Sequence, residues 1–204
     1  KKDGYWISYR DNNIIPSYDG QISSKGNYKN GKKEGAWVSY AEQDGQLKSI
    51  GNYNNGLKDG TWFELSYIWK NSKQLNKIMT ASIYKEIEVT NHMFKSEYKN
   101  GELVGTSLDY EDGKIRNISN YKKGGWRHGS LVRYYENGQI ENKQNWKNNI
   151  KEGLEYQYFE NGSLYFKGMF KNGKQNGYSY YYYEDGTLDK QTSGTYKDGV
   201  KIGD

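Results

Sequence analysis

The sequence predicts an all-β protein: an elongated, single-layer antiparallel sheet of tandem β-hairpin repeats. A glycine-led segment recurs along the 204 residues, beginning at Gly4, Gly35, Gly60, Gly105, Gly129, Gly153 and Gly177. Within each segment, apolar and polar residues alternate over short runs, which is the period of a β-strand. Dipeptides of Asn-Gly or Asp-Gly separate these runs, as in hairpin turns. The last four of these glycines are 24 residues apart, and a period of 24 with two insertions is the signature of a repeat array.

Each repeat is interpreted as one hairpin. Its first strand spans about six residues, and its second begins with an aliphatic residue and ends near an aromatic one. The turn inside the hairpin is expected at Asp44-Gly45, Asp112-Gly113, Asn137-Gly138, Asn161-Gly162 and Asp185-Gly186. Asn-Gly and Asp-Gly are favoured where the backbone must adopt positive φ, as in type I′ hairpin turns. A second turn, such as Asn30-Gly31 or Asn172-Gly173, leads into the next unit.

We expect residues 1–204 to form a single repeat domain of about seven hairpin units with an insertion at about 76–96. An isolated hairpin is marginally stable in water, so each unit depends on its neighbours. The inserted residues partly alternate, which fits an extra hairpin or a strand extension. Two interpretations of the insertion stay open: a surface loop without a binding role, and a contact with a specific partner.

The composition argues against disorder and restricts the chemistry. The chain has 22 Tyr and 6 Trp but one Pro and no Cys, so amphipathic rings supply its apolar surface. No stretch approaches the length of a transmembrane helix. The absence of cysteine fits the cytosol as well as a secreted or periplasmic protein. The first residues look like the middle of a repeat, so an earlier natural start and a removed targeting segment stay open.

The sequence predicts no enzyme, no metal site and no cofactor. His92 and His128 lie far apart in the chain, and the acidic residues recur mostly in turns. Catalysis needs dissimilar groups that converge with tuned pKa values, and no such set is visible. The glycines follow the repeat and form no phosphate-binding loop.

One column of tyrosines is a candidate partner-binding surface. It stands five residues after the leading glycines and contains Tyr9, Tyr40, Tyr110, Tyr134, Tyr158 and Tyr182. The column two residues earlier shares its face, because side chains two apart in a strand point to the same side. Tyrosine is favoured at protein interfaces. The alternative is that these rings only brace the sheet.

Charge is predicted to separate the two edges of the sheet. Lysines gather in the turns between repeats, where Lys32, Lys33, Lys122 and Lys123 are candidate partner-binding residues. Acidic residues gather in the turns within hairpins. The formal net charge is +5. A basic edge serves either solubility and protection against edge pairing or the steering of an anionic partner.

The repeat consensus, G-x-W-x-x-Y-x-x-x-G-x-L-x-x-x-G-x-Y-x-N-G-K-x-x-G, resembles the bacterial variant of the MORN repeat (membrane occupation and recognition nexus). Residues 35–40, Gly-Ala-Trp-Val-Ser-Tyr, and residues 51–56, Gly-Asn-Tyr-Asn-Asn-Gly, carry it best. Bacterial chains of this type are often classed with YwqK-like antitoxins, and the resemblance implies a scaffold or a neutraliser of a partner toxin. The later units depart from the consensus, because its tryptophan is replaced at Ser107, Leu131, Glu155 and Ser179.

The leading functional hypothesis is a protein-binding repeat module, with an antitoxin or immunity protein as its most specific form. The alternatives are attachment of the basic edge to an anionic membrane surface, and cell-wall carbohydrate binding through neighbouring rings such as Tyr134-Tyr135. Nucleic acid is disfavoured, because the net charge is modest and the acidic edge would repel a phosphate backbone. Unpaired strands at both ends of the sheet would favour end-to-end self-association.

Overall fold

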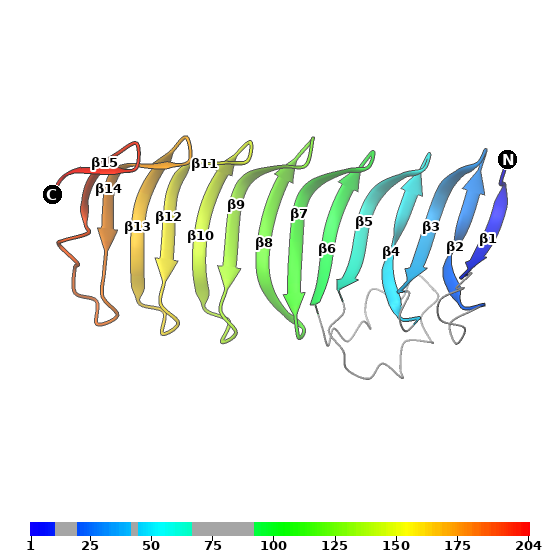
Figure 1. The fold of residues 1–204 in the computed structure, drawn as a ribbon, viewed down its shortest axis with the longest axis horizontal. Coiled ribbons are helices and arrows are strands. Elements are labelled where there is room, and N and C mark those ends of the chain that lie inside the picture. The colour runs from blue at the N-terminus through cyan, green and yellow to red at the C-terminus, as the bar shows by residue number, and fades with distance from the viewer. Residues whose placement is uncertain (11–19, 42–44, 67–91) are drawn as a thin grey trace. The chain divides into compact units, whose positions relative to one another are not determined.

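Over the residues that the structure describes, the chain forms a 16-stranded antiparallel sheet in which neighbouring strands follow the order of the chain (Figure 1). The computed structural model describes residues 1–10, 20–41, 45–66 and 92–204. No helix occurs among these residues, and the predicted all-β class of consecutive hairpins is confirmed. The strands are β1 (Gly4–Tyr9), β2 (Ile22–Lys29), β3 (Lys32–Tyr40), β4 (Leu47–Asn54), β5 (Leu57–Ser66), β6 (His92–Lys99), β7 (Glu102–Glu111), β8 (Lys114–Lys122), β9 (Trp126–Tyr134), β10 (Ile140–Lys147), β11 (Ile150–Lys151), β12 (Gly153–Tyr158), β13 (Leu164–Lys171), β14 (Lys174–Tyr181), β15 (Gly194–Lys197) and β16 (Val200–Gly203).

The chain divides into two compact units, which are described separately. The first contains Lys1–Glu102 and Tyr110–Gly113, and the second contains Leu103–Asp109 and Lys114–Asp204. The single repeat domain over residues 1–204 stays a prediction. The expected insertion at 76–96 lies outside the described residues up to residue 91. Its last part, 92–96, belongs to β6, where Ser96 pairs with Trp62 of β5.

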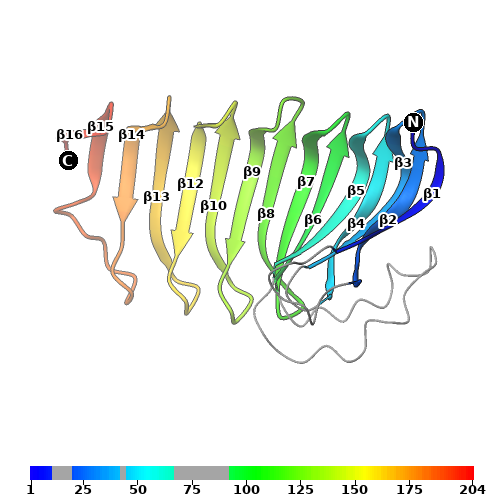
Figure 2. The same cartoon turned by 45° about the vertical axis from the view of Figure 1, so that its right-hand side comes forward.

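Two classes of turn lie on opposite edges of each unit (Figures 1 and 2). Turns between repeats are tight: Asn30 and Gly31 have φ of 54° and 83°, and Asn172 and Gly173 have 51° and 81°. Positive φ at both central residues matches the type I′ turn. Among the turns inside hairpins, Asp112-Gly113 has the same pair of signs, with φ of 47° and 75°.

Three later turns inside hairpins, at Asn137-Gly138, Asn161-Gly162 and Asp185-Gly186, differ from the type I′ turn, because φ is positive at the glycine only. The physical reason is an extra residue in the loop. In the first of them, the Gly138 amide donates to the Tyr135 carbonyl at 3.0 Å, and the Tyr135 amide donates to the Gln139 carbonyl at 2.9 Å. A three-residue hairpin loop of this kind needs its glycine only at the last position.

The last repeat also differs from the expected hairpin. Leu188, which was expected to begin its second strand, forms an isolated bridge with Tyr182, and β15 begins only at Gly194. Between these points, the Ser193 hydroxyl accepts a hydrogen bond from the Tyr181 amide at 2.8 Å. Strand pairing is therefore interrupted between Leu188 and Gly194, and within this segment the Ser193 side chain is hydrogen-bonded to β14.

Replacing Asn172 with alanine is expected to lower the free energy of unfolding by about 1 kcal/mol, because alanine tolerates the left-handed backbone at this turn less well than asparagine. Urea unfolding measures the change. Lys171→Ala, at the exposed neighbouring position, should change stability by no more than about 0.5 kcal/mol. Equal effects of the two variants would contradict the turn assignment.

The core of the first unit is a row of tryptophans that cover glycines of the neighbouring strand. Trp37 and Trp62 are 3% and 2% exposed. A Cβ atom on Gly26 would lie 2.4 Å from the Trp37 ring, so the indole occupies the space that a side chain there would need. The Trp37 indole N–H donates to the Asn27 carbonyl at 2.9 Å. The row thus buries large rings and satisfies their polar atoms at the same time.

Tyrosines and lysines complete this row. Tyr28 and Tyr53 meet Trp37 edge-to-face, at ring centroid distances of 5.1 and 6.0 Å. The Lys33 ammonium lies over Trp37 and Tyr53, at 4.3 and 4.9 Å from the ring centroids. Lys2 and Lys58 repeat this arrangement over Trp6 with Tyr28 and over Trp62 with Tyr98. Cation–π contacts therefore couple each repeat to the next.

The second unit has no tryptophan in the column of this row, and two of the residues that replace it are buried and polar. Glu155 and Ser179 stand in the tryptophan column, and they are 1% and 0% exposed. The Glu155 carboxylate accepts hydrogen bonds from the side-chain amides of Asn142, Gln144 and Gln157 at 2.8 to 3.1 Å. The Lys151 ammonium lies 2.7 Å from its other oxygen. This buried carboxylate therefore connects side chains of β10, β11 and β12 in the second unit.

Candidate binding surfaces

The predicted tyrosine column lies on the face of the sheet opposite the tryptophan row, because its members are three residues further along the strand. In five described hairpins the tyrosine pairs directly with the aliphatic residue that follows the turn: Tyr9 with Ile22, Tyr40 with Leu47, Tyr134 with Ile140, Tyr158 with Leu164 and Tyr182 with Leu188. Tyr9 is 60% exposed, whereas Tyr40, Tyr110, Tyr134, Tyr158 and Tyr182 are half-buried. Most of this column contributes to the packing of the sheet, and its role in binding stays a prediction.

Further exposed side chains of the same face stand one residue after the leading glycine, a column that the sequence interpretation missed. Tyr5 and Tyr178 are each 58% exposed, and Leu154 is 36% exposed. The signal was present in the sequence. This column holds a large apolar residue only at those three positions, and small or hydroxylated residues stand at Ala36, Thr61, Thr106 and Ser130.

Leu154 and Tyr178 form part of a continuous surface in the second unit. We call this surface the C-terminal apolar patch, and it comprises Leu154, Tyr156, Lys167, Met169, Tyr178 and Tyr180. Leu154 pairs with Met169 across β12 and β13, and Lys167 pairs with both Tyr156 and Tyr180. The rings of Tyr178 and Tyr180 stack, with an interplanar angle of 12° and centroids 6.0 Å apart. Met169 and Tyr180 are 40% and 37% exposed. The patch therefore offers apolar side chains with a lysine among them.

The candidate lysines fall into two groups. Lys33 lies over the tryptophan row, and burial lowers the pKa of its ammonium. Lys32, Lys122 and Lys123 are exposed at the turns between repeats. Lys33 thus packs against the aromatic rings of the first unit, whereas the other three lysines are exposed at turns. The binding role of all four lysines stays a prediction.

Carboxylates lie among the lysines of the predicted basic edge. The Glu34 carboxylate accepts a hydrogen bond from the Asn55 amide at 2.9 Å, and that of Glu152 accepts one from the Asn172 amide at 2.9 Å. Asp59 forms an ion pair with Lys99 at 3.3 Å. These acids connect each turn to the strand of the preceding repeat, and they reduce the positive potential of this edge. The expected separation of charge is therefore incomplete.

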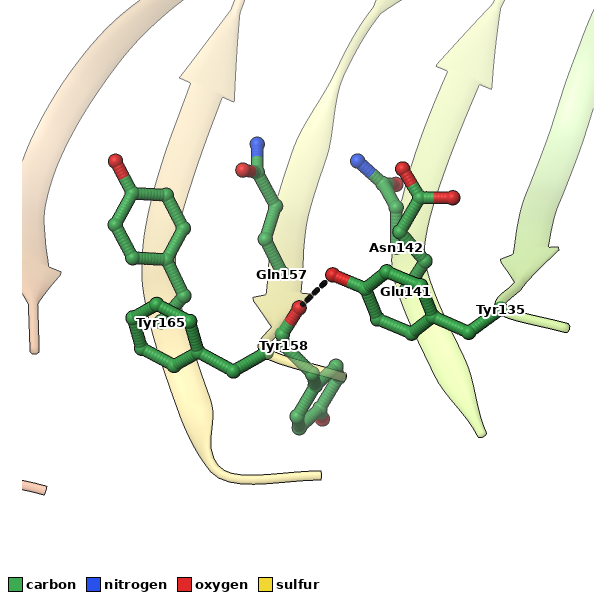
Figure 3. A pocket seen from close by; sticks show the side chains of 7 residues that line it. Tyr135, Glu141, Asn142, Gln157, Tyr158 and Tyr165 are labelled. Atoms are coloured by element: carbon green, nitrogen blue, oxygen red, sulfur yellow. Dashed lines mark hydrogen bonds between the residues drawn. The ribbon is translucent and has the colours of Figure 1, made fainter. Parts of the chain in front are cut away.

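A shallow pocket of about 250 Å³ lies in the second unit, on the face opposite the C-terminal apolar patch (Figure 3). We call it the bulge pocket, because two of its residues are the extra residues of β-bulges: Glu141 lies between the paired Ile140 and Asn142, and Tyr165 lies between Leu164 and Phe166. The pocket is lined by Tyr135, Glu141, Asn142, Gln157, Tyr158, Phe159 and Tyr165.

The bulges supply two walls of this pocket, but equivalent bulges at Ser23 and Lys48 show that its floor must also differ. A bulge turns one additional side chain toward the face that its neighbours already use. The floor of the pocket is the cross-strand pair of Asn142 and Gln157. In the next repeat the equivalent of Gln157 is Tyr181, whose ring lies 6.1 Å from that of Tyr165 and 4.7 Å from that of Phe166. An amide in place of a ring therefore leaves the pocket open.

In the described part of the chain, no group of three or more His, Cys, Asp or Glu side chains is placed to hold a metal ion. Over the same residues, none of the elements is a helix long and apolar enough to cross a membrane. His92 instead contacts Glu111, with 3.0 Å between its Nε2 atom and the carboxylate.

Comparison with known proteins agrees with a repeat module for binding. The family described as MORN repeat variant matches residues 127–148 and 151–172, which are two successive hairpin units. These matches support a MORN-repeat protein. No curated protein matches the chain.

A likeness to one solved structure is too weak to carry an inference. The crystal structure of TarM aligns with 69% of this chain at 12% sequence identity and a TM-score of 0.29. The aligned part is 20% of that chain, so the likeness spans about a fifth of its length.

Proposed function

We propose that the chain is a non-catalytic repeat module that binds a partner protein through the C-terminal apolar patch. Exposure carries the proposal: Leu154, Met169, Tyr178 and Tyr180 are 36–58% exposed although they adjoin one another. Contiguous exposed apolar surface of this kind marks interaction sites. Tyrosine and methionine are enriched at protein interfaces. An antitoxin or immunity protein, bound to its toxin, is the most specific form of this proposal.

The patch also indicates the chemistry of its partner. Lys167 lies among the apolar residues of the patch, and Lys143 pairs with Tyr156 at its border. A partner surface with an apolar centre and carboxylates opposite these ammonium groups would complement it. We favour such a protein over an anionic membrane, because a membrane would engage the basic edge, where the carboxylates of Glu34, Asp59 and Glu152 already lie.

Replacing Met169, Tyr178 and Tyr180 together with alanine is expected to weaken partner binding at least tenfold and to leave the unfolding midpoint nearly unchanged. The side chains are exposed in the free protein, so their loss removes contacts that form only in the complex. The measurement is quantitative mass spectrometry of proteins captured by each form. The dissociation constant of the captured protein is then measured with purified components.

Trp126→Ala is the matched control, because Trp126 is a large ring that is 46% exposed at the edge with the turns between repeats. The control should capture the same protein as the unaltered chain. Lys167→Glu should also weaken binding if the partner presents carboxylates. Equal capture by the triple variant and the unaltered chain would contradict the proposal. Salt-sensitive binding to anionic vesicles that the triple variant retains would favour the membrane alternative.

A further inference from the structure

The bulge pocket presents hydrogen-bond acceptors, because Glu155 already uses the donors of its floor. The side-chain N–H groups of Asn142 and Gln157 point to the buried Glu155 carboxylate, at 3.1 and 2.8 Å. Each amide group therefore has its oxygen left for another contact. The Asn142 oxygen is buried and accepts no hydrogen bond from the described residues. An unpaired buried acceptor is costly, so a ligand that donates there would be favoured.

Aromatic rings and a carboxylate complete the pocket. The Tyr135 hydroxyl donates to the Tyr158 carbonyl at 2.7 Å, which fixes the ring at one side (Figure 3). Tyr165 stands at the other side, and its ring meets that of Phe159 edge-to-face with centroids 5.1 Å apart. Glu141 is a lining residue that also faces Arg133 of the same chain, with 3.5 Å between the guanidinium and the carboxylate. The pocket thus combines rings held in place with a negative group.

Two carboxylates, those of Glu141 and Glu160, act on the Tyr135 hydroxyl at the pocket. Burial raises the pKa of the Tyr135 hydroxyl, and the carboxylates of Glu141 and Glu160 raise it further. Among the residues that line the pocket there is no lysine, arginine or histidine. A cationic ligand in the pocket would meet the Glu141 carboxylate, which it would share with the Arg133 guanidinium.

We propose that the bulge pocket binds the guanidinium group of an arginine side chain from a peptide or protein. A guanidinium carries five N–H donors and no acceptor, which suits a floor of amide oxygens beside a carboxylate. Its flat face stacks on aromatic rings. A quaternary ammonium would use the rings but has no N–H for the floor. A sugar would match the rings but gains less from the carboxylate, since it is uncharged.

The experiment is a titration of the ¹⁵N-labelled chain with N-acetyl-arginine amide, followed by NMR. We expect saturable shifts of the Asn142 and Gln157 side-chain amides, with a dissociation constant on the order of 1–10 mM for so small a ligand. N-acetyl-lysine amide, tetramethylammonium and N-acetylglucosamine should each bind at least fivefold more weakly. Equal or tighter binding of any of the three, or no saturable shift with the arginine ligand, would overturn the proposal.

Two variants and a control test the site itself. Gln157→Tyr copies the ring of the next repeat into the pocket and should weaken binding at least tenfold. Glu141→Gln keeps the size of the side chain and should weaken it at least fivefold, so the test stands even if the larger variant does not fold. Tyr178→Ala lies on the opposite face and should leave binding unchanged. Failure here would leave the proposed protein-binding role of the C-terminal apolar patch intact, and unchanged binding by both pocket variants would overturn the assignment.

Discussion

Replacing Trp37 with alanine is expected to lower the free energy of unfolding of the first unit by about 3–5 kcal/mol, the range for truncating a large buried aromatic side chain. The ring is 3% exposed, covers Gly26 and donates to the Asn27 carbonyl. Its loss leaves that carbonyl without its side-chain donor and Lys33 without one of its two rings. Urea unfolding followed by tyrosine and tryptophan fluorescence measures the change.

Trp6→Ala is the matched control for this prediction. Trp6 stands in the same column of the repeat and also donates through its indole N–H, to the Asp3 carbonyl at 3.0 Å. Because its side chain is 37% exposed, its loss should cost about half as much or less. Equal losses from the two positions would show that burial in the row is not what makes tryptophan stabilising there.

Replacing Glu155 with alanine is expected to destabilise the second unit by about 3–5 kcal/mol. The change removes one partner of a buried ion pair and leaves the other charge uncompensated. Lys151 and three side-chain amides lose the acceptor that they share. Thermal unfolding measured by circular dichroism reports the loss, which should appear as a lower midpoint.

Glu160→Ala is the control for this prediction, because Glu160 is exposed in the turn between β12 and β13. It should change the free energy of unfolding by no more than about 0.5 kcal/mol. A stable Glu155→Ala variant would show that the polar network of the second unit is dispensable. It would also weaken the argument that Glu155 orients the floor of the bulge pocket.

The fold could be predicted from the sequence because the repeat and the strand period agree in nearly every unit. Glycine spacing places the units, and alternation places the strands. The type of the turns was less certain, since Asn-Gly occurs both in the two-residue turn at Asn172-Gly173 and in the longer loop at Asn137-Gly138. The number of residues between paired strands decides which turn forms, and pairing is not visible in a dipeptide.

The candidate surfaces could be predicted only in part. Tyr158 and Tyr178 look equivalent as tyrosines of a repeat, but Tyr158 pairs with Leu164 and is half-buried, whereas Tyr178 is 58% exposed. Exposure depends on the residue across the strand pair, so it follows from register and not from residue type. The exposure of Lys33 could not be predicted either. Its position near a turn indicated a solvated charge, but its ammonium lies over the rings of Trp37 and Tyr53.

The bulge pocket could not be predicted from the sequence. It depends on two extra residues, Glu141 and Tyr165, which interrupt the pairing of their strands. Alternation would have placed each of them on the opposite face from its neighbours. A bulge reverses that assignment locally, and although it recurs directly after the aliphatic residue that opens the second strand, its presence follows from strand pairing and not from residue type.

Hydroxyl-radical footprinting of the chain, with and without the captured partner protein, tests the central claim most directly, because it reports the solvent accessibility of individual tyrosine and methionine side chains. The account predicts that Met169, Tyr178 and Tyr180 are oxidised in the free chain and protected in the complex, whereas Tyr9, which is 60% exposed, is oxidised equally in both. Protection of Tyr9 with unchanged oxidation of those three residues would contradict the claim that the C-terminal apolar patch is the binding surface.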